Sequence, residues 1–246
     1  MTQTRFHVLP DGRRMAYRHS PGAGPALVFL PGYMSDMAGG KASAVFDWAV
    51  AQGRECLLLD YPGCGESEGQ FCDGTLSGWR GDVVCLLSDI CVHPVCLVGS
   101  SMGGWLMLLV ALELPLKIKG MVGIAAAPDF TEWGFDSDQK SKLASGEILF
   151  EENPYGPEPT PTYPAFWADG QANRLLDKEI PLDCPVRLLH GQADPDVPWE
   201  VSLRLADKLR SADVQVQLVK DGDHRLSREQ DIALLLNMLA ALPGVS

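Results

Sequence analysis

A serine between glycines is the residue of this sequence that is best placed for nucleophilic chemistry. The segment Gly99-Ser100-Ser101-Met102-Gly103 lies between an apolar run at 95–98 and an apolar, helix-like stretch at 104–112. The middle serine, Ser101, therefore sits at a turn from a strand to a helix, where glycines give room because they carry no Cβ. The Gly-x-Ser-x-Gly pattern is weak by itself, but the flanking strand and helix support it. We expect Ser101 to be a nucleophile.

A histidine and an acid later in the chain could activate this hydroxyl, which is a poor nucleophile until a base takes its proton. Asp194 follows a strand-like run at 185–190, and His224 follows another at 214–220. The three residues come in the order Ser, Asp, His, each at the carboxyl end of an expected strand, where ligand sites of open α/β sheets form. We expect Asp194 to orient His224, and His224 to be the base.

Other interpretations of the acid, the serine and the base stay open. Asp196 lies two residues after Asp194, and Asp129 follows the expected strand at 120–125, so either could supply the acid. We favour Asp194. Ser101 could be an ordinary helix N-cap, because serine is common there. His190 lies inside an apolar strand, which favours a core histidine with local hydrogen bonds over a base.

Acyl transfer also needs donors for the oxygen that becomes negative in the tetrahedral intermediate. One expected donor is the backbone N–H of Met102, the residue after the nucleophile. The other is the backbone N–H of Tyr33, in the loop that follows the strand-like run at 26–30. The phenol of Tyr33 has no part in this expectation. The alternative is that Pro31-Gly32 is only a turn.

The composition fits one enzyme domain, so we expect residues 1–246 to form a single unit. The net charge of −12 disfavours nucleic acid and anionic membrane surfaces as partners. Seven cysteines include no Cys-x-x-Cys pair and form an odd total, which suggests neither a disulfide framework nor a zinc site. The longest apolar stretch, 105–112, is too short to span a membrane. The first residues run straight into a strand without room for a presequence, so we expect a soluble, cytoplasmic protein.

Eight strands and five helices alternate along most of the chain. The expected strands are 5–9, 14–18, 26–30, 55–60, 95–99, 120–125, 185–190 and 214–220, and the expected helices lie near 40–51, 76–90, 101–113, 198–210 and 227–241. This alternation predicts an α/β fold with a mainly parallel, eight-stranded sheet and helices on both faces. The first two strands, joined at Asp11-Gly12, should form an antiparallel hairpin at its edge.

One stretch, about 129–181, breaks the alternation after the sixth strand. Loops this long are usually lids or disordered linkers, and aromatic residues argue against disorder. The aromatic residues here include Trp133, Phe135, Phe150, Tyr155, Tyr163, Phe166 and Trp167. We expect a small cap over the active site, with an apolar lining that suits an acyl chain or an aromatic acid. The alternative is that these side chains only pin the segment to the body.

With these residues in view, the sequence resembles the serine hydrolases of the α/β-hydrolase superfamily. Within it, the chain resembles mitochondrial palmitoyl-protein thioesterases that also act as acyl-glucuronide esterases. The similarity spans most of residues 26–236 and is poor through the cap. The segments that carry it are Leu30-Pro-Gly-Tyr33, Asp60-Tyr-Pro-Gly-Cys-Gly-Glu-Ser67, residues 97–108, Cys184-Pro-Val-Arg-Leu-Leu-His-Gly191, Val197-Pro-Trp199 and Asp223-His-Arg225. The absence of a presequence favours a bacterial-type relative.

The resemblance implies an α/β-hydrolase fold with Ser101, Asp194 and His224 as a catalytic triad. It also implies hydrolysis of S-acyl cysteine or acyl glucuronide, from a small molecule or an S-acylated protein, without a cofactor or metal. Carbon–carbon bond hydrolases, peptidases and perhydrolases with the same triad stay open. So does a ligand-binding protein that kept the fold without its chemistry, since a fold does not establish activity. The sequence carries no signal of oligomeric state.

Overall fold

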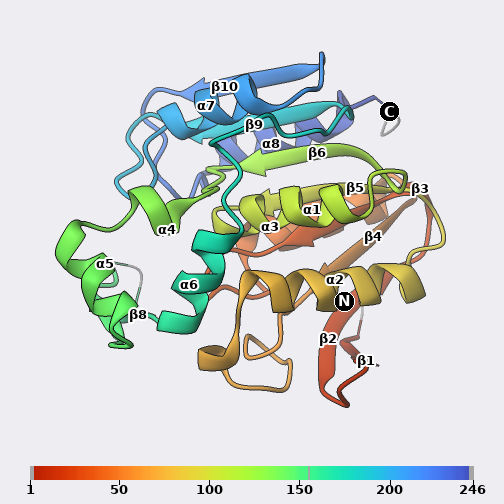
Figure 1. The fold of residues 1–246 in the computed structure, drawn as a ribbon. Coiled ribbons are helices and arrows are strands. Elements are labelled where there is room, and N and C mark those ends of the chain that lie inside the picture. Colours follow the sequence, from red (N-terminus) through yellow and green to blue (C-terminus); the bar gives the residue numbers. More distant parts are fainter. Residues whose placement is uncertain (1–2, 155, 244–246) are drawn as a thin grey trace.

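The structure is a computed structural model that describes residues 3–154 and 156–243. Its main feature is an eight-stranded sheet with the strand order β1-β2-β4-β3-β5-β6-β9-β10 (Figure 1). The strands are β1 (Arg5–Val8), β2 (Arg14–Ser20), β3 (Ala23–Leu30), β4 (Arg54–Leu59), β5 (Val95–Ser100), β6 (Ile118–Ile124), β9 (Val186–Gly191) and β10 (Val214–Val219). Strand β2 pairs antiparallel with β1 and with β4, and the remaining pairs are parallel. The expected mainly parallel sheet and its edge hairpin are confirmed.

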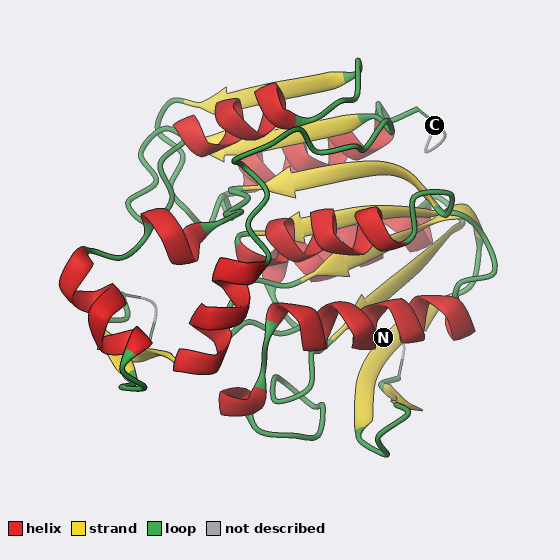
Figure 2. Cartoon of the chain, viewed as in Figure 1, coloured by secondary structure: helices red, strands yellow, loops and turns green. Residues whose placement is uncertain are grey.

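Helices cover both faces of the sheet (Figure 2). One face carries α1 (Gly40–Ala51) and α8 (Glu229–Ala240), and the other carries α2 (Leu76–Ile90), α3 (Met102–Glu113) and α7 (Glu200–Lys208). These are the five expected helices. Helix α3 is apolar around its whole circumference because 10 of its 12 residues are buried, which is typical of a central helix.

The segment between β6 and β9, residues 129–181, is called the inserted segment below. It holds α4 (Phe130–Trp133), α5 (Ser137–Ala144), β7 (Leu149–Glu151), β8 (Thr160–Thr162) and α6 (Pro164–Ala172). Strands β7 and β8 form a separate antiparallel pair. Helix α6 packs against α2 and against η1 (Phe71–Asp73), whereas α5 and the small sheet project beyond the main sheet (Figure 1). Tyr155, one of the aromatic residues expected in the cap, lies outside the described residues.

A cluster of aromatic rings joins the inserted segment to the body. Phe166 of α6 is only 1% exposed, and its ring centroid lies 4.9 Å from that of Tyr33, 5.9 Å from Trp79 and 5.7 Å from Phe130. At least this aromatic side chain therefore packs the inserted segment onto the body of the protein, as in the alternative considered from the sequence. No helix in the described part of the chain is long and apolar enough to cross a bilayer.

Candidate active site

Ser101 lies at the tight turn between β5 and α3. Its φ of 54° falls in the left-handed region, which costs a non-glycine residue energy, and a bond from its N–H to the carbonyl of Ile124 at 2.9 Å helps to hold it. A Cβ on Gly99 would lie 2.4 Å from the carbonyl oxygen of Gly103, and a Cβ on Gly103 would lie 2.1 Å from that of Leu30. The glycines that frame the serine are therefore required by close backbone contacts, as the sequence indicated.

The structure brings Ser101, His224 and Asp194 together from three separate loops. Nε2 of His224 lies 3.1 Å from Oγ of Ser101, and Nδ1 of His224 lies 2.8 Å from Oδ2 of Asp194. Because a carboxylate only accepts hydrogen bonds, Nδ1 carries the hydrogen and Nε2 is left to accept from the serine hydroxyl. The chain of bonds can therefore move a proton from the hydroxyl to the imidazole.

The carboxylate of Asp194 is fully buried and fully hydrogen-bonded. Its Oδ1 accepts from the backbone N–H groups of Asp196 and Val197 at 2.8 and 2.9 Å, and its Oδ2 also lies 3.3 Å from Nε2 of His190. Burial raises the pKa of Asp194, but hydrogen bonds from His190 and His224 outweigh it, and the resulting pKa is lowered. The group is therefore a charged acceptor throughout the neutral range.

The other two aspartates considered from the sequence lie in different surroundings. Asp129 is buried at the start of the inserted segment, where its carboxylate accepts from the N–H groups of Leu175 and Leu176 at 2.8 Å each. Burial raises the pKa of Asp129. It joins the two ends of the inserted segment and does not orient His224. Asp196 is exposed at the edge of the pocket described below.

The loop after β3, which holds the expected donor Tyr33, passes close to the serine. A Cβ on Gly32 would lie 3.4 Å from Cβ of Ser101. Two residues after β4 hold this loop: the buried hydroxyl of Tyr61 donates to the carbonyl of Pro31 at 3.0 Å, and Oδ1 of Asp60 accepts from the N–H of Met37 at 2.7 Å. Sequence reasoning missed both anchors.

Removing the Tyr61 hydroxyl tests whether this anchor matters. In Tyr61→Phe the carbonyl of Pro31 stays buried without its donor, so we expect a loss of about 1 to 3 kcal/mol in unfolding free energy. Urea denaturation measures that loss. Activity should fall with it, because the loop would no longer be held against Ser101. A variant as stable and as active as the wild type would show that the loop holds its position without this bond.

The phenol of Tyr33 has a separate role from its backbone. Its hydroxyl donates to the carbonyl of Pro161 in β8 at 2.9 Å, and burial raises its pKa. The ring packs edge-on against Phe71 at a centroid distance of 4.9 Å. This side chain therefore connects the loop after β3 with the inserted segment, a connection that the sequence did not indicate.

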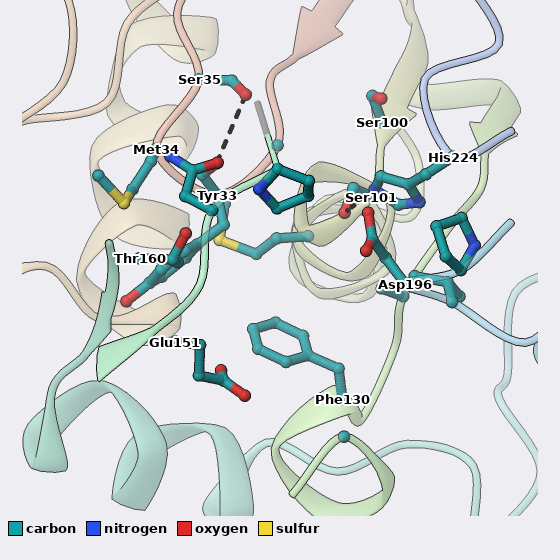
Figure 3. A pocket seen from close by; sticks show the side chains of 18 of the residues that line it. Tyr33, Met34, Ser35, Ser100, Ser101, Phe130, Glu151, Thr160, Asp196 and His224 are labelled. Atoms are coloured by element: carbon teal, nitrogen blue, oxygen red, sulfur yellow. Dashed lines mark hydrogen bonds between the residues drawn. The ribbon is translucent and has the colours of Figure 1, made fainter. Parts of the chain in front are cut away.

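A pocket of about 630 Å³ opens above Ser101 and His224. Figure 3 shows Ser101, His224 and Asp196 on one side, with Tyr33, Thr160 and Glu151 across from them. The apolar part of its wall includes Ala127, Phe130, Trp133 and Phe135, which come from the inserted segment and the loop before it. A pocket of this volume is in the range that takes drug-sized ligands.

Charged residues that sequence reasoning missed line the rest of the pocket. Nζ of Lys41, at the start of α1, donates to the backbone carbonyl of Arg225, next to His224. Burial, together with the nearby Arg225 guanidinium, lowers the pKa of Lys41 to about 8. Burial also raises the pKa of Glu151, on β7. Nothing in the local sequence around Lys41 or Glu151 marks either residue, because only the fold brings them to the serine.

Two groups of side chains in the described ranges could each offer a metal ion three ligand atoms within 4.8 Å of one another. One comprises Asp194, Asp196 and His224, and the other His7, Cys85 and Asp89. In the first group, Asp194 and His224 already bind each other, and His224 also binds the serine hydroxyl. The sequence predicts no metal and no cofactor, and this stays a prediction.

Comparisons with known proteins give a consistent result. The sequence model of the alpha/beta hydrolase family matches residues 27–235. The human mitochondrial palmitoyl-protein thioesterase ABHD10 is 37% identical over 239 residues, which cover 96% of this chain and 78% of the relative. The corresponding protein of Mus musculus is 40% identical over 227 residues, covering 90% and 76%. The resemblance indicated by the sequence motifs is confirmed.

Solved structures agree. A crystal structure of a protein from Agrobacterium vitis S4 covers 98% of both chains with a TM-score of 0.90 and 39% identity. Mouse alpha/beta hydrolase domain-containing protein 10 covers 96% of both chains with a TM-score of 0.89 and 36% identity. The names of the thioesterase relatives place them in mitochondria, so the cytoplasmic location expected from the sequence is not confirmed and stays a prediction.

Proposed function

Because this chain belongs to the alpha/beta hydrolase family, we propose that it is a serine hydrolase that cleaves acyl thioesters or esters through an acyl-enzyme on Ser101. The observation that carries the proposal is the chain of contacts from Ser101 through His224 to Asp194, at 3.1 and 2.8 Å, at one side of a partly apolar pocket. A nucleophile, a base and a buried acid in this order are the arrangement that acyl transfer needs.

In the first half of the proposed reaction, Oγ of Ser101 attacks the acyl carbonyl carbon while Nε2 of His224 takes the hydroxyl proton. The carbonyl oxygen becomes negative and accepts hydrogen bonds from the backbone N–H groups of Tyr33 and Met102. His224 then gives its proton to the departing thiol or alcohol as the bond to the acyl carbon breaks. Asp194 stays charged and stabilises the imidazolium between these two steps.

In the second half, water takes the place of the leaving group. His224 removes a proton from the water, the resulting hydroxide attacks the acyl carbon, and the tetrahedral intermediate again places its negative charge on the same two N–H groups. Collapse of the intermediate returns the proton to Oγ of Ser101 and releases the carboxylic acid. The substrate and one water molecule supply every atom of the products, and the three side chains return to their starting protonation states.

We propose that the inserted segment is a cap on a single domain, residues 1–246, and that it receives the acyl group. Phe130, Trp133 and Phe135 supply apolar wall on the side of the inserted segment. Each methylene buried against such a wall contributes about 0.8 kcal/mol, so the cap would select acyl chains by length and shape. The named activity of the relatives, palmitoyl-protein thioesterase, supports an S-acylated protein or a small acyl thioester as substrate, with acyl glucuronides as the ester counterpart.

A fluorophosphonate probe tests the proposed nucleophile directly, because it reacts only with an activated serine. We expect one covalent adduct on the peptide that contains Ser101, found by mass spectrometry after proteolysis. The matched control is Ser100→Ala, which removes the neighbouring hydroxyl at the end of β5 and should leave labelling intact. Ser101→Ala should abolish it. Equal labelling of Ser101→Ala, or no labelling of the wild type, would remove the acyl-enzyme proposal.

A further inference from the structure

A second histidine contacts the same aspartate and is itself paired with a second serine. His190, at the end of β9, and Ser202, in α7, are both buried, with exposed fractions of 0% and 1%. Nδ1 of His190 lies 2.7 Å from Oγ of Ser202, and Nε2 of His190 lies 3.3 Å from Oδ2 of Asp194. The same Oδ2 lies 2.8 Å from Nδ1 of His224. A continuous row of side chains thus runs from a buried serine to the proposed nucleophile.

The hydrogens of this row can be assigned from its partners. Nε2 of His190 faces the carbonyl oxygen of Val197 at 3.0 Å as well as the carboxylate of Asp194, and both are acceptors. Nε2 therefore carries a hydrogen, which is directed chiefly to Val197 and lies close to Asp194. Nδ1 is then left to accept from the hydroxyl of Ser202. The two acceptors at Nε2 therefore set the tautomer, and the bond to Ser202 holds the ring in the orientation that places this donor beside the carboxylate.

We propose that Ser202 and His190 are positioning residues that fix the orientation of Asp194 and share its negative charge with His224, and so set the acid side of the pH–activity profile. The inference rests on the proposed function, because it concerns the acid of the same site. It goes beyond that function in assigning a role to two residues that do not contact the substrate pocket.

Other charged groups around Asp194 come from three elements. Lys41 lies at the start of α1, Asp196 on the same loop as Asp194, and Asp223 and Arg225 flank His224 after β10. None of them lies on β9 or α7. Substitutions of His190 and Ser202 therefore leave all of these charges in place, and a change in the pH profile can be assigned to the row itself.

The direction of the effect follows from competition for one oxygen. His190 and His224 both place an N–H near Oδ2 of Asp194. Each N–H therefore partly neutralises the carboxylate charge and weakens the interaction of that charge with the other histidine. Without the donor of His190, the carboxylate interacts more strongly with the protonated form of His224, and that form persists to higher pH. Activity needs the neutral form of His224. On acidification, a variant without the His190 donor should therefore lose activity at a higher pH than the wild type does. The freed carboxylate should also be less well oriented, which lowers kcat.

The test compares three variants at the row. His190→Leu removes the donor, and we expect its acid limb to move up by about half a pH unit and its kcat to fall about tenfold. Ser202→Ala loses the bond that holds the orientation of the His190 ring, and its acid limb should shift in the same direction by less. His190→Gln keeps an amide donor near the position of Nε2 and should restore most of the wild-type profile.

Leu189→Val is the matched control for a purely structural effect. Leu189 is buried on the same strand and packs in the core on the other face of the sheet, so this substitution perturbs β9 without touching the row. It should lower the unfolding free energy in urea and leave the pH profile unchanged. Circular dichroism establishes that each variant is folded. If His190→Leu does not fold, Ser202→Ala and His190→Gln carry the test.

Two outcomes overturn the inference. One is an acid limb at the wild-type pH in His190→Leu or, where that variant does not fold, in Ser202→Ala. The other is a shift of the same size in Leu189→Val. Failure of the proposed function would be different, because the wild-type protein would then show neither turnover of acyl esters and thioesters nor fluorophosphonate labelling. Wild-type labelling together with unchanged profiles in the variants rejects the positioning role alone.

Discussion

Replacing Ser101 with alanine is expected to lower kcat for an acyl thioester by about a million-fold, to the residual rate that the oxyanion donors and substrate binding still supply. In the proposed mechanism Oγ of Ser101 forms the bond to the acyl carbon, and among the described residues it is the hydroxyl oxygen that Nε2 of His224 contacts, at 3.1 Å. Stability should change little, because the side chain lies at the pocket and not in the core. Initial rates with a chromogenic acyl ester and with a thiol-trapping thioester assay measure the effect.

The double variant Ser101→Ala/His224→Ala gives the sharper control. Residues that act as one unit show strongly non-additive losses, so the double variant should be about as slow as either single one. Losses that multiply would mean that the two residues act independently. A Ser101→Ala protein that keeps more than about one percent of the activity would contradict the nucleophile assignment, once contamination is excluded by a second purification.

Replacing Asp194 with asparagine is expected to cost about 10⁴ in kcat, the second-largest effect. The amide has nearly the same shape, so the loop geometry should survive. Its NH₂ group, however, can only donate where Oδ2 now accepts from Nδ1 of His224. The imidazole would then hold its hydrogen on Nε2, facing Ser101, and could no longer accept the hydroxyl proton. KM should change much less than kcat, because the carboxylate is buried away from the substrate.

Asp196→Asn is the matched control, since it makes the same chemical change two residues away at an exposed position. We expect it to stay within about tenfold of the wild-type kcat. Asp129→Asn should lower stability, because its carboxylate holds the backbone of Leu175 and Leu176, and should leave the pH profile unaltered. A larger kcat loss for Asp196→Asn than for Asp194→Asn would reverse the assignment of the acid.

The parts of the site that were predictable from the sequence share one physical basis. Ser101, Asp194 and His224 each follow a strand of the parallel sheet, and the carboxyl ends of parallel strands meet at one edge. The strands expected from the sequence therefore indicated that residues far apart in the chain would lie at the same edge of the sheet. The meeting of Nδ1 of His224 with Asp194, and not with Asp129, depended on loop geometry that no local pattern encodes.

The inserted segment was predicted as an ordered cap over the active site, but its helices and strands were not predicted. Its strands β7 and β8 have three residues each, too few to show an alternation, and β8 contains Pro161 at its centre. Two signals could have located its helices. Asp136 and Gln139 form the capping box at the start of α5, and Pro164 occupies the first turn of α6.

The anchors around the site were not predictable for a different reason. Tyr61, Lys41 and Ser202 act through partners that are 30 or more residues away, or in a neighbouring element, and each has an ordinary sequence context. His190 was expected to be a satisfied core histidine. Its bonds to Val197 and Ser202 agree with that expectation, and its 3.3 Å contact with Asp194 adds the connection to the site.

Tyr33 connects two parts of the site, one through its backbone and the other through its side chain. Its main chain is a proposed donor to the reacting oxygen, and its phenol is bonded to the carbonyl of Pro161 on the far side of the pocket. An acyl chain that displaces β8 must therefore lengthen the hydrogen bond between Tyr33 and Pro161 or displace Tyr33 together with the strand. Under the proposed function, we therefore expect an acyl chain that fits poorly to lower kcat as well as to raise KM, because displacement of Tyr33 would move the proposed backbone donor.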